Sequence, residues 1–377
     1  MTAKHEPYTL YKSDISYFSG KLEAYLRYKQ IPHQPVDLNR QLMERIGAAT
    51  GVLKMPAVET ADGLWLFDTT PMIQWFEAEY PEPPIFPTDP ALSFLALLVE
   101  DYADEWLWRP AMWWRWFPRA SRWALGWRIA NEFMPRVVAR PFGWYFGRRQ
   151  LNEWLWDDGV GKGNAEQVRD MLYREFEFLE PLLESQPYLL GSHPSIADFG
   201  YFASMFRHFG NDVESAEVMR RQAPNTYEWL ARLWNARPGK LSAQQQWIWP
   251  QATFWQPLLQ RICKDYLPYL HQNALAHQAR SKRFDYEGET LSFSQTKTTT
   301  YRVWCRENLQ QAFANLSAAD QRRVEDLLAD SGGLTALHQD GNISSGLAEM
   351  YELPLDPATS TPPPISLRTR LFGQARN

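Results

Sequence analysis

The sequence is poor in cysteine, and it lacks several segments that would mark other classes of protein. Of its 377 residues only Cys263 and Cys305 are cysteines, and neither belongs to a C-x-x-C spacing. This excludes a disulfide framework and a cysteine-based zinc site, and it indicates a reducing compartment. No run of about 18 apolar residues exists to span a membrane, and the start, MTAKHEPYTLYKSD, has no apolar signal core. We therefore expect a soluble cytoplasmic protein.

The chain also lacks an excess of positive charge. It carries 39 Lys and Arg against 44 Asp and Glu, a net charge of −5, so no overall basic field favours nucleic acid. Hydrophobic residues make up 45% and charged residues 22%, which is the balance of a globular protein with a real core. The length predicts two or three domains.

The first 85 residues alternate between strand-like and helix-like patterns. Asp62-Gly63 stands between two alternating apolar runs, which is a hairpin signal. Pro71 suits the first turn of the helix that follows, and Thr69 or Thr70 can cap that helix. The expected order is strand 8–11, helix 17–30, strand 33–38, helix 40–47, strands 55–60 and 64–68, and helix 69–80. This is the order of a thioredoxin-like domain.

Three short stretches in this region combine residues suited to binding or catalysis. In SDISYFSGK, Ser16 and Ser19 have the spacing of a Cys-Pro-Tyr-Cys redox turn with hydroxyls in place of both thiols. This stretch has three possible interpretations: a redox site without sulfur, a site that uses the sulfur of a ligand, or a helix cap. Pro56 must begin a strand or a special turn, and composition alone favours an ordinary trans bond. Asp68-Thr69, at a strand-to-helix junction, either holds an amino-acid head group or only caps the helix.

Together, SYFSGKLEAYL, KMPAVE, FDTTPMIQWFEAEYP and the later YLLGSHPSIADFGYF resemble the glutathione transferase superfamily over roughly residues 7–240. The resemblance implies a thioredoxin-like glutathione-binding domain over 7–87 and an all-α helical-bundle domain over 91–245. It also implies that Met55 and a cis Pro56 bind the cysteinyl backbone of glutathione, and that Asp68 with Thr69 binds its γ-glutamyl head. The usual pair is an acidic residue followed by serine, so Asp-Thr is a departure.

In this alignment the catalytic sulfur belongs to glutathione as co-substrate. Ser16 precedes a helix that begins near Tyr17, and helix N-termini lower a thiol pKa from about 8.5 toward neutrality. A hydroxyl that donates to the thiolate adds to this effect. The catalytic candidates are Ser16 and Tyr17. Tyr11, where other branches of the family place a catalytic tyrosine, remains a rival, and so does a pure capping role for Ser16.

A segment rich in tryptophan and arginine follows in the helical region. From Glu105 to Gln150 there are nine arginines and two glutamates. Three interpretations of these side chains are open. They line a pocket, they rest on an anionic membrane surface, or they simply pack with arginine stems over aromatic faces. The resemblance places Trp108, Arg109, Met112 and Trp113 beside the electrophile. Further along, Ser195 and Asp198 form a capping-box pattern, and we interpret them as structural.

The resemblance ends near residue 245. We expect residues 246–350 to form a mainly helical extension with a β-hairpin over RFDYEGETLSFS, and residues 351–377 to be a proline-rich flexible tail. Trp247, Trp249 and Trp255 would expose apolar surface unless the extension docks. We expect docking on the tryptophan-rich face of the helical domain, where the extension restricts acceptors and leaves the glutathione subsite untouched. The alternative is an independent module on a linker.

These observations predict a glutathione-dependent transferase that acts on a hydrophobic electrophile, without a metal. The alternative is a glutathione-binding or glutathione-fold scaffold with little catalysis, since fold alone does not decide function. The resemblance further implies a homodimer and a role in detoxification.

Overall fold

The computed structural model describes residues 5–133, 136–242 and 244–358. Its N-terminal part has the order β-α-β-α-β-β-α that the sequence predicts, which confirms a thioredoxin-like domain. Its elements are β1 (Tyr8–Lys12), α1 (Tyr17–Tyr28), β2 (His33–Asp37), α2 (Arg40–Thr50), β3 (Ala57–Glu59), β4 (Trp65–Phe67) and α3 (Thr69–Glu79).

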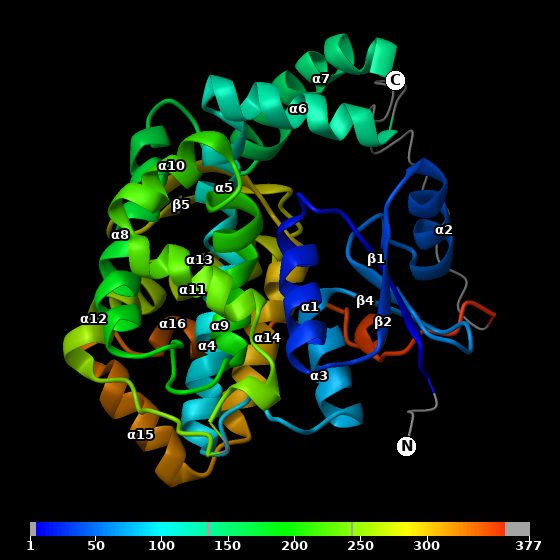
Figure 1. Cartoon of the computed structure of the whole chain (residues 1–377). Helices are drawn as coiled ribbons and strands as arrows, with labels where there is room; N and C mark the ends of the chain where they lie inside the picture. Colours follow the sequence, from blue (N-terminus) through cyan, green and yellow to red (C-terminus); the bar gives the residue numbers. More distant parts are fainter. Residues whose placement is uncertain (1–4, 134–135, 243, 359–377) are drawn as a thin grey trace.

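The four strands form one mixed sheet in the order β2-β1-β3-β4. β1 is parallel to β2 and antiparallel to β3, and β3 is antiparallel to β4. Helices α1 and α3 lie between this sheet and the helical part, and α2 lies on its outer side (Figure 1). On α1, the predicted inward residues Leu22, Tyr25 and Leu26 are fully buried. Their spacing of three and four residues is the reason that they share one face of the helix.

The second part is an all-α bundle with α9 at its centre (Figure 1). Its elements are α4 (Pro90–Glu105), α5 (Trp108–Trp116), α6 (Arg119–Phe133), α7 (Arg136–Gln150), the π-helical segments η1 (Leu151–Trp156) and η2 (Met205–Phe209), α8 (Ala165–Ser185), α9 (Ile196–Ser204), α10 (Val213–Gln222), α11 (Pro224–Trp234) and the 3₁₀ turn η3 (Pro238–Lys240).

The predicted capping box at the start of α9 is confirmed. The Asp198 carboxylate accepts from the Ser195 N–H at 2.9 Å, and the Asp198 N–H donates back to the Ser195 hydroxyl at 3.4 Å. The same carboxylate also accepts from the Leu189 N–H and the Trp229 indole. Although burial raises the pKa of Asp198 to about 6, all of these partners belong to the helical core. Asp198 therefore holds the central helix in place.

A buried ion cluster joins the two parts. The Lys21 ammonium on α1 has no exposed surface and pairs with Glu100 and Asp104 on α4. Thr70 on α3 donates to the same Glu100 at 2.8 Å. A buried ion pair that loses one partner leaves an uncompensated charge, which is strongly destabilising. The cluster therefore favours one relative position of α1, α3 and α4.

The extension is folded and packs on the helical bundle, with the predicted hairpin present. Its elements are α12 (Ala252–Arg261), η4 (Ile262–Tyr266), α13 (Leu267–Gln278), β5 (Arg283–Glu287), β6 (Ser292–Lys297), α14 (Thr300–Ala314), α15 (Ala318–Leu328), η5 (Ala329–Ser331), α16 (Thr335–His338) and η6 (Glu349–Tyr351). Within the described residues, each helix is too short or too polar to cross a bilayer.

The expected docking surface of the extension was only partly right. Trp106, from the tryptophan-rich segment, does pack against Tyr266 and Tyr269 of the extension, at 5.9 and 5.5 Å between ring centroids. Trp255, however, contacts Phe178 on α8. Further along, Leu355 pairs with Trp65 on β4, so the extension crosses the bundle and returns to the thioredoxin-like domain.

Candidate functional site

The strand register brings three predicted segments to one edge of the sheet. Tyr11 pairs with Ala57, and Ala57 pairs with Phe67. The turn 13–16 continues from β1 beyond this row, residues 55–56 lead into β3, and Asp68 follows β4. Because antiparallel neighbours run in opposite directions, all three segments leave the sheet at the same side. This edge is the candidate site.

Ser16 lies at the N-terminus of α1, as predicted. Its hydroxyl accepts from the Ser19 N–H at 3.3 Å, so it caps the helix. A hydroxyl has one donor and two acceptor positions, and capping uses only an acceptor. Its hydrogen therefore remains able to point at an anion above the helix N-terminus. Ser16 is partly exposed there.

An arginine that sequence reasoning missed fixes this turn. Arg115 on α5 donates from Nη1 to the Ile15 carbonyl at 2.7 Å, and its Nε pairs with Asp212 at 2.7 Å. The guanidinium is buried, so it links the turn before Ser16 to the helical bundle. The tryptophan-rich pattern allowed for such packing arginines, but nothing in it singled out Arg115.

Both rival tyrosines already have partners for their hydroxyls. Tyr17 is buried and donates to the Ala103 carbonyl at 2.6 Å. Tyr11 donates to Glu59 at 2.6 Å and accepts from Arg45 at 2.8 Å. Burial raises the pKa of Tyr17 well above its usual value, and burial together with Glu59 raises the pKa of Tyr11 to about 12. Neither phenol is prepared to lose its proton near neutral pH.

The Met55–Pro56 peptide bond is cis, so the trans bond that composition favoured was wrong. The resemblance had implied the cis form. Pro56 is buried just before β3, and Met55 is partly exposed at the site edge. Within the described residues, the Met55 N–H and C=O make no backbone hydrogen bond. An extended peptide-like ligand can therefore pair with them.

Asp68, rather than Thr69 or Thr70, is the N-cap of α3, which corrects that expectation. Its φ of 64° and ψ of 127° are uncommon for a residue other than glycine, and such strain is concentrated at functional sites. Its side chain makes no capping hydrogen bond, so the first N–H groups of α3 have no side-chain cap. A carboxylate at the mouth of an uncapped helix N-terminus suits a ligand that has both an ammonium and a carboxylate.

The extension covers Asp68, which contradicts the expectation that it leaves this subsite untouched. Tyr301 on α14 donates to the Asp68 carboxylate at 3.0 Å, and Tyr351 on η6 donates at 3.3 Å. Lys54 pairs with the same carboxylate at 3.2 Å and lies 4.7 Å from the Tyr301 ring centroid. Only 10% of the Asp68 side chain remains exposed. A ligand ammonium would need the oxygens that these three groups now occupy.

The start of the predicted flexible tail is ordered at this place. Leu355 and Trp65 exchange two backbone hydrogen bonds of 2.7 and 2.8 Å along the edge of β4. The Tyr351 ring packs against Trp304 and Phe67. The prediction of a flexible tail is therefore wrong for residues 351–358, and the rest of that tail, 359–377, lies outside the described residues.

Of the four predicted acceptor residues, Trp108 packs against the start of α1. The Trp108 ring is stacked with Phe18, at 6.2 Å and 12° between the rings, and meets Tyr17 edge-on. Met112 and Trp113 follow on α5 and are 5% and 7% exposed. Trp108 thus borders the start of α1 directly, while Met112 is buried and Trp113 packs against Trp114 and Phe117.

The fourth predicted acceptor residue, Arg109, does not contact the start of α1 but is directed toward Asp158 and the extension. Its guanidinium is 1% exposed, pairs with Asp158 at 3.1 Å and donates to the Tyr269 hydroxyl at 2.6 Å. It also lies 4.2 Å from the Phe293 ring centroid. Because the extension surrounds it on these sides, Arg109 belongs to the interface with the extension and not to an acceptor surface.

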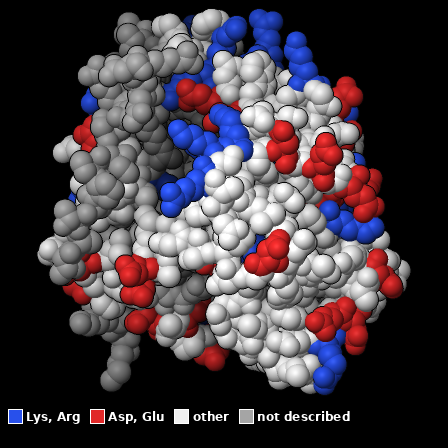
Figure 2. Space-filling view, turned by 180° about the vertical axis from the view of Figure 1, so that it is seen from behind, with Lys and Arg blue, Asp and Glu red and all other residues white. Residues whose placement is uncertain are grey.

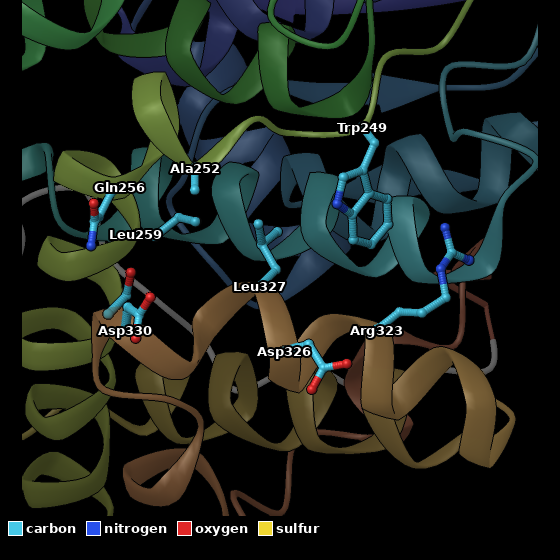
Figure 3. A pocket seen from close by; sticks show the side chains of 9 residues that line it. Trp249, Ala252, Gln256, Leu259, Arg323, Asp326, Leu327 and Asp330 are labelled. Atoms are coloured by element: carbon cyan, nitrogen blue, oxygen red, sulfur yellow. The ribbon is translucent and has the colours of Figure 1, made fainter.

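A groove of about 550 Å³ lies away from this edge, between α12 and α15 (Figure 3). Trp249, Leu259, Leu327 and Arg323 line it, and none of the predicted site residues does. Arg323 lies over the Trp249 ring, 4.5 Å from its centroid, and pairs with Asp89 at 2.7 Å.

Among the described residues no group of three or more His, Cys, Asp or Glu side chains is placed to hold a metal ion.

Comparison with known proteins agrees with this arrangement. The family description "Glutathione S-transferase, N-terminal domain" matches residues 10–84, and "Glutathione S-transferase, C-terminal domain" matches residues 136–238. No curated protein matches the chain.

Solved structures with similar folds have low identity. A glutathione S-transferase from Rhodospirillum rubrum F11 is 17% identical, with 65% of this chain and 97% of that chain covered and a TM-score of 0.41. FzlA from C. crescentus is 18% identical, with 60% and 87% covered and a TM-score of 0.40. A Methylobacterium radiotolerans glutathione S-transferase, in complex with glutathione sulfonate, is 17% identical, with 65% and 98% covered and a TM-score of 0.40.

Two domain families thus match in the expected order, over a thioredoxin-like domain and a helical bundle. On this basis, residues 10–84 and 136–238 of the chain belong to the glutathione transferase superfamily.

Proposed function

We propose that this protein is a glutathione-dependent transferase that activates the glutathione thiolate for attack on a hydrophobic electrophile. The observation that carries the proposal is the position of the Ser16 hydroxyl. It caps α1 through an acceptor position, while the hydroxyls of Tyr11 and Tyr17 are held by Glu59 and the Ala103 carbonyl. Ser16 is thus the hydroxyl best able to donate to a thiolate at this helix N-terminus.

The remaining parts of the site would position glutathione. The Met55 backbone groups, beside Pro56, would pair with the cysteinyl residue. Asp68 would take the γ-glutamyl ammonium, and the N-terminus of α3, which begins at Thr69, would take its carboxylate. Positioning of this kind turns an encounter between two molecules into a reaction within one complex.

In the reaction, Ser16 and the N-terminus of α1 would stabilise the thiolate and lower the thiol pKa. The sulfur would form a bond to an electrophilic carbon, with loss of a leaving group or addition of a proton. Trp108 would face the acceptor, with Met112 and Trp113 behind it. By resemblance, the proposal includes a cytoplasmic homodimer that acts in detoxification.

Coverage of Asp68 adds a condition to this proposal. Tyr301, Tyr351 and Lys54 occupy the carboxylate, so the γ-glutamyl head can bind only when they move away. Lys54 is 45% exposed on its side chain and can swing into solvent. The tyrosines belong to α14 and η6 of the extension.

The proposal is tested by retention of the full chain on immobilised glutathione, followed by a screen of electrophiles of several reaction types. Retention with turnover is the expected result. Retention without turnover would favour the scaffold alternative, and neither retention nor turnover would contradict both glutathione-based functions.

A further inference from the structure

Helices α6 and α7 form a hairpin at one end of the molecule, beyond the bundle (Figure 1). Four large aromatic side chains on this hairpin are exposed to solvent: Trp123, Trp127, Trp144 and Tyr145, at 53, 43, 58 and 51%. Since exposed aromatic residues that gather on one element mark an interaction site more often than scattered ones do, this hairpin needs a partner that covers them.

The two helices pack so closely that the large aromatic rings lie outside the contact between them. A Cβ atom added to Gly126 would lie 2.4 Å from the Gly143 carbonyl oxygen, and one added to Gly143 would lie 2.6 Å from the Gly126 oxygen. The backbones therefore touch where α6 and α7 meet. Leu125 and Phe146 are buried, while the tryptophans are directed outward.

The hairpin is also strongly basic. Residues 119–150 contain seven arginines, one glutamate and no lysine or aspartate, a net charge of +6 in a chain whose net charge is −5. Figure 2 shows basic side chains along the upper end of the molecule, where Figure 1 places α6 and α7. Burial, and then the positive charges of Arg148 and Arg119, lower the pKa of Arg122. The arginines repel one another here.

Four of these arginines, Arg119, Arg128, Arg140 and Arg148, are exposed. Apart from residues 132–138, whose side chains the structure does not describe, no carboxylate of the described residues lies within ion-pair distance of these four arginines. Arg148 instead lies 5.3 Å from the centroid of the Trp144 ring. Positive charge and aromatic surface are thus both present on the hairpin, and both are open to a partner.

We propose that the α6–α7 hairpin docks on the surface of an anionic lipid bilayer. Guanidinium groups pair with lipid phosphates, and Trp and Tyr rings prefer the boundary between headgroups and acyl chains. The exposed aromatics here are tryptophan and tyrosine, which are the interfacial types. A second copy of the chain would bring the same +6 charge to the same face, so repulsion disfavours self-pairing there. Single-stranded nucleic acid is bound in basic grooves, whereas this surface is a projecting helix pair.

The test uses the full chain and flotation with vesicles. One set contains phosphatidylcholine alone, and the other contains phosphatidylcholine with a minority of phosphatidylglycerol. We expect binding only to the anionic set, with loss of binding at high salt. Each Arg→Gln substitution among the four exposed arginines should weaken binding about fivefold. Trp144→Ala should also weaken binding.

Matched controls exist elsewhere on the surface. Arg322→Gln on α15 and Phe254→Ala on α12 change an exposed arginine and an exposed aromatic residue away from the hairpin (Figure 1), and they should leave binding unchanged. Circular dichroism should show that all variants are folded. The proposal would be overturned by no binding to anionic vesicles, by equal loss in the control variants, or by tighter binding to a single-stranded oligonucleotide than to the vesicles. Concentration-dependent self-association that the hairpin substitutions abolish would also overturn it, in favour of a second copy.

Discussion

The Tyr351→Phe substitution tests whether the extension competes with glutathione for Asp68. It removes the hydroxyl that donates to the carboxylate at 3.3 Å and keeps the ring that packs on Trp304 at 4.6 Å. A hydrogen bond to a charged group contributes about 1.5–3 kcal/mol, and the long distance favours about 1.5 kcal/mol here. That free energy corresponds to a factor of about ten in the ratio of covered to uncovered Asp68.

The apparent affinity of a ligand scales with the fraction of protein in the competent form. Glutathione should therefore bind Tyr351→Phe up to about tenfold more tightly than it binds the original chain. Adding Tyr301→Phe, which removes the 3.0 Å bond, should increase the affinity again. Isothermal titration calorimetry measures both, with Tyr227→Phe on α11 as a matched control.

Unchanged or weaker binding in Tyr351→Phe and in the double variant would refute the idea that these tyrosines compete with the ligand. Absence of glutathione binding in every protein, the control included, would instead contradict the proposed function. The two failures are thus distinguishable.

Two further substitutions test the site and the core. Asp68→Asn should weaken glutathione binding by about 1.5–3 kcal/mol while the fold survives, as calorimetry and circular dichroism would show, and unchanged affinity would remove Asp68 from the site. Burial raises the pKa of Asp101 to about 7, above about 3.9 for an unfolded chain, so the folded state binds its proton more tightly and the free energy of unfolding falls as pH rises from about 4 to about 7. Asp101→Asn should remove this part of the fall when urea unfolding is compared at about pH 5 and about pH 8, and an identical fall in both proteins would contradict the assignment.

Features that depend on neighbours in the sequence could be predicted. The hairpin around Asp62-Gly63, the cap of α9 at Ser195 and the start of α1 after Ser16 each follow from a few adjacent residues. The edge of the sheet that holds Met55 and Asp68 follows from the order of these elements. The family resemblance then supplied the cis form at Pro56, which composition did not.

Features that depend on distant segments could not be predicted. Tyr301 and Tyr351 are separated from Asp68 by 233 and 283 residues, and no local pattern marks a tyrosine as its partner. The position of Arg109 could not be predicted for the same reason, because its partner Tyr269 is 160 residues away. The sequence led us to expect that the extension docks, but only the packed structure shows that it reaches Asp68.

The most direct measurement of the central claim is the titration of the glutathione thiolate on the protein. Thiolate absorbance is followed against pH for the original chain, Ser16→Ala and Tyr17→Phe, each saturated with glutathione. If Ser16 donates to the thiolate, Ser16→Ala should raise the apparent thiol pKa and slow conjugation more near neutral pH than at high pH, while Tyr17→Phe leaves the titration in place. A titration that moves only in Tyr17→Phe would contradict the account and leave Ser16 as a helix cap.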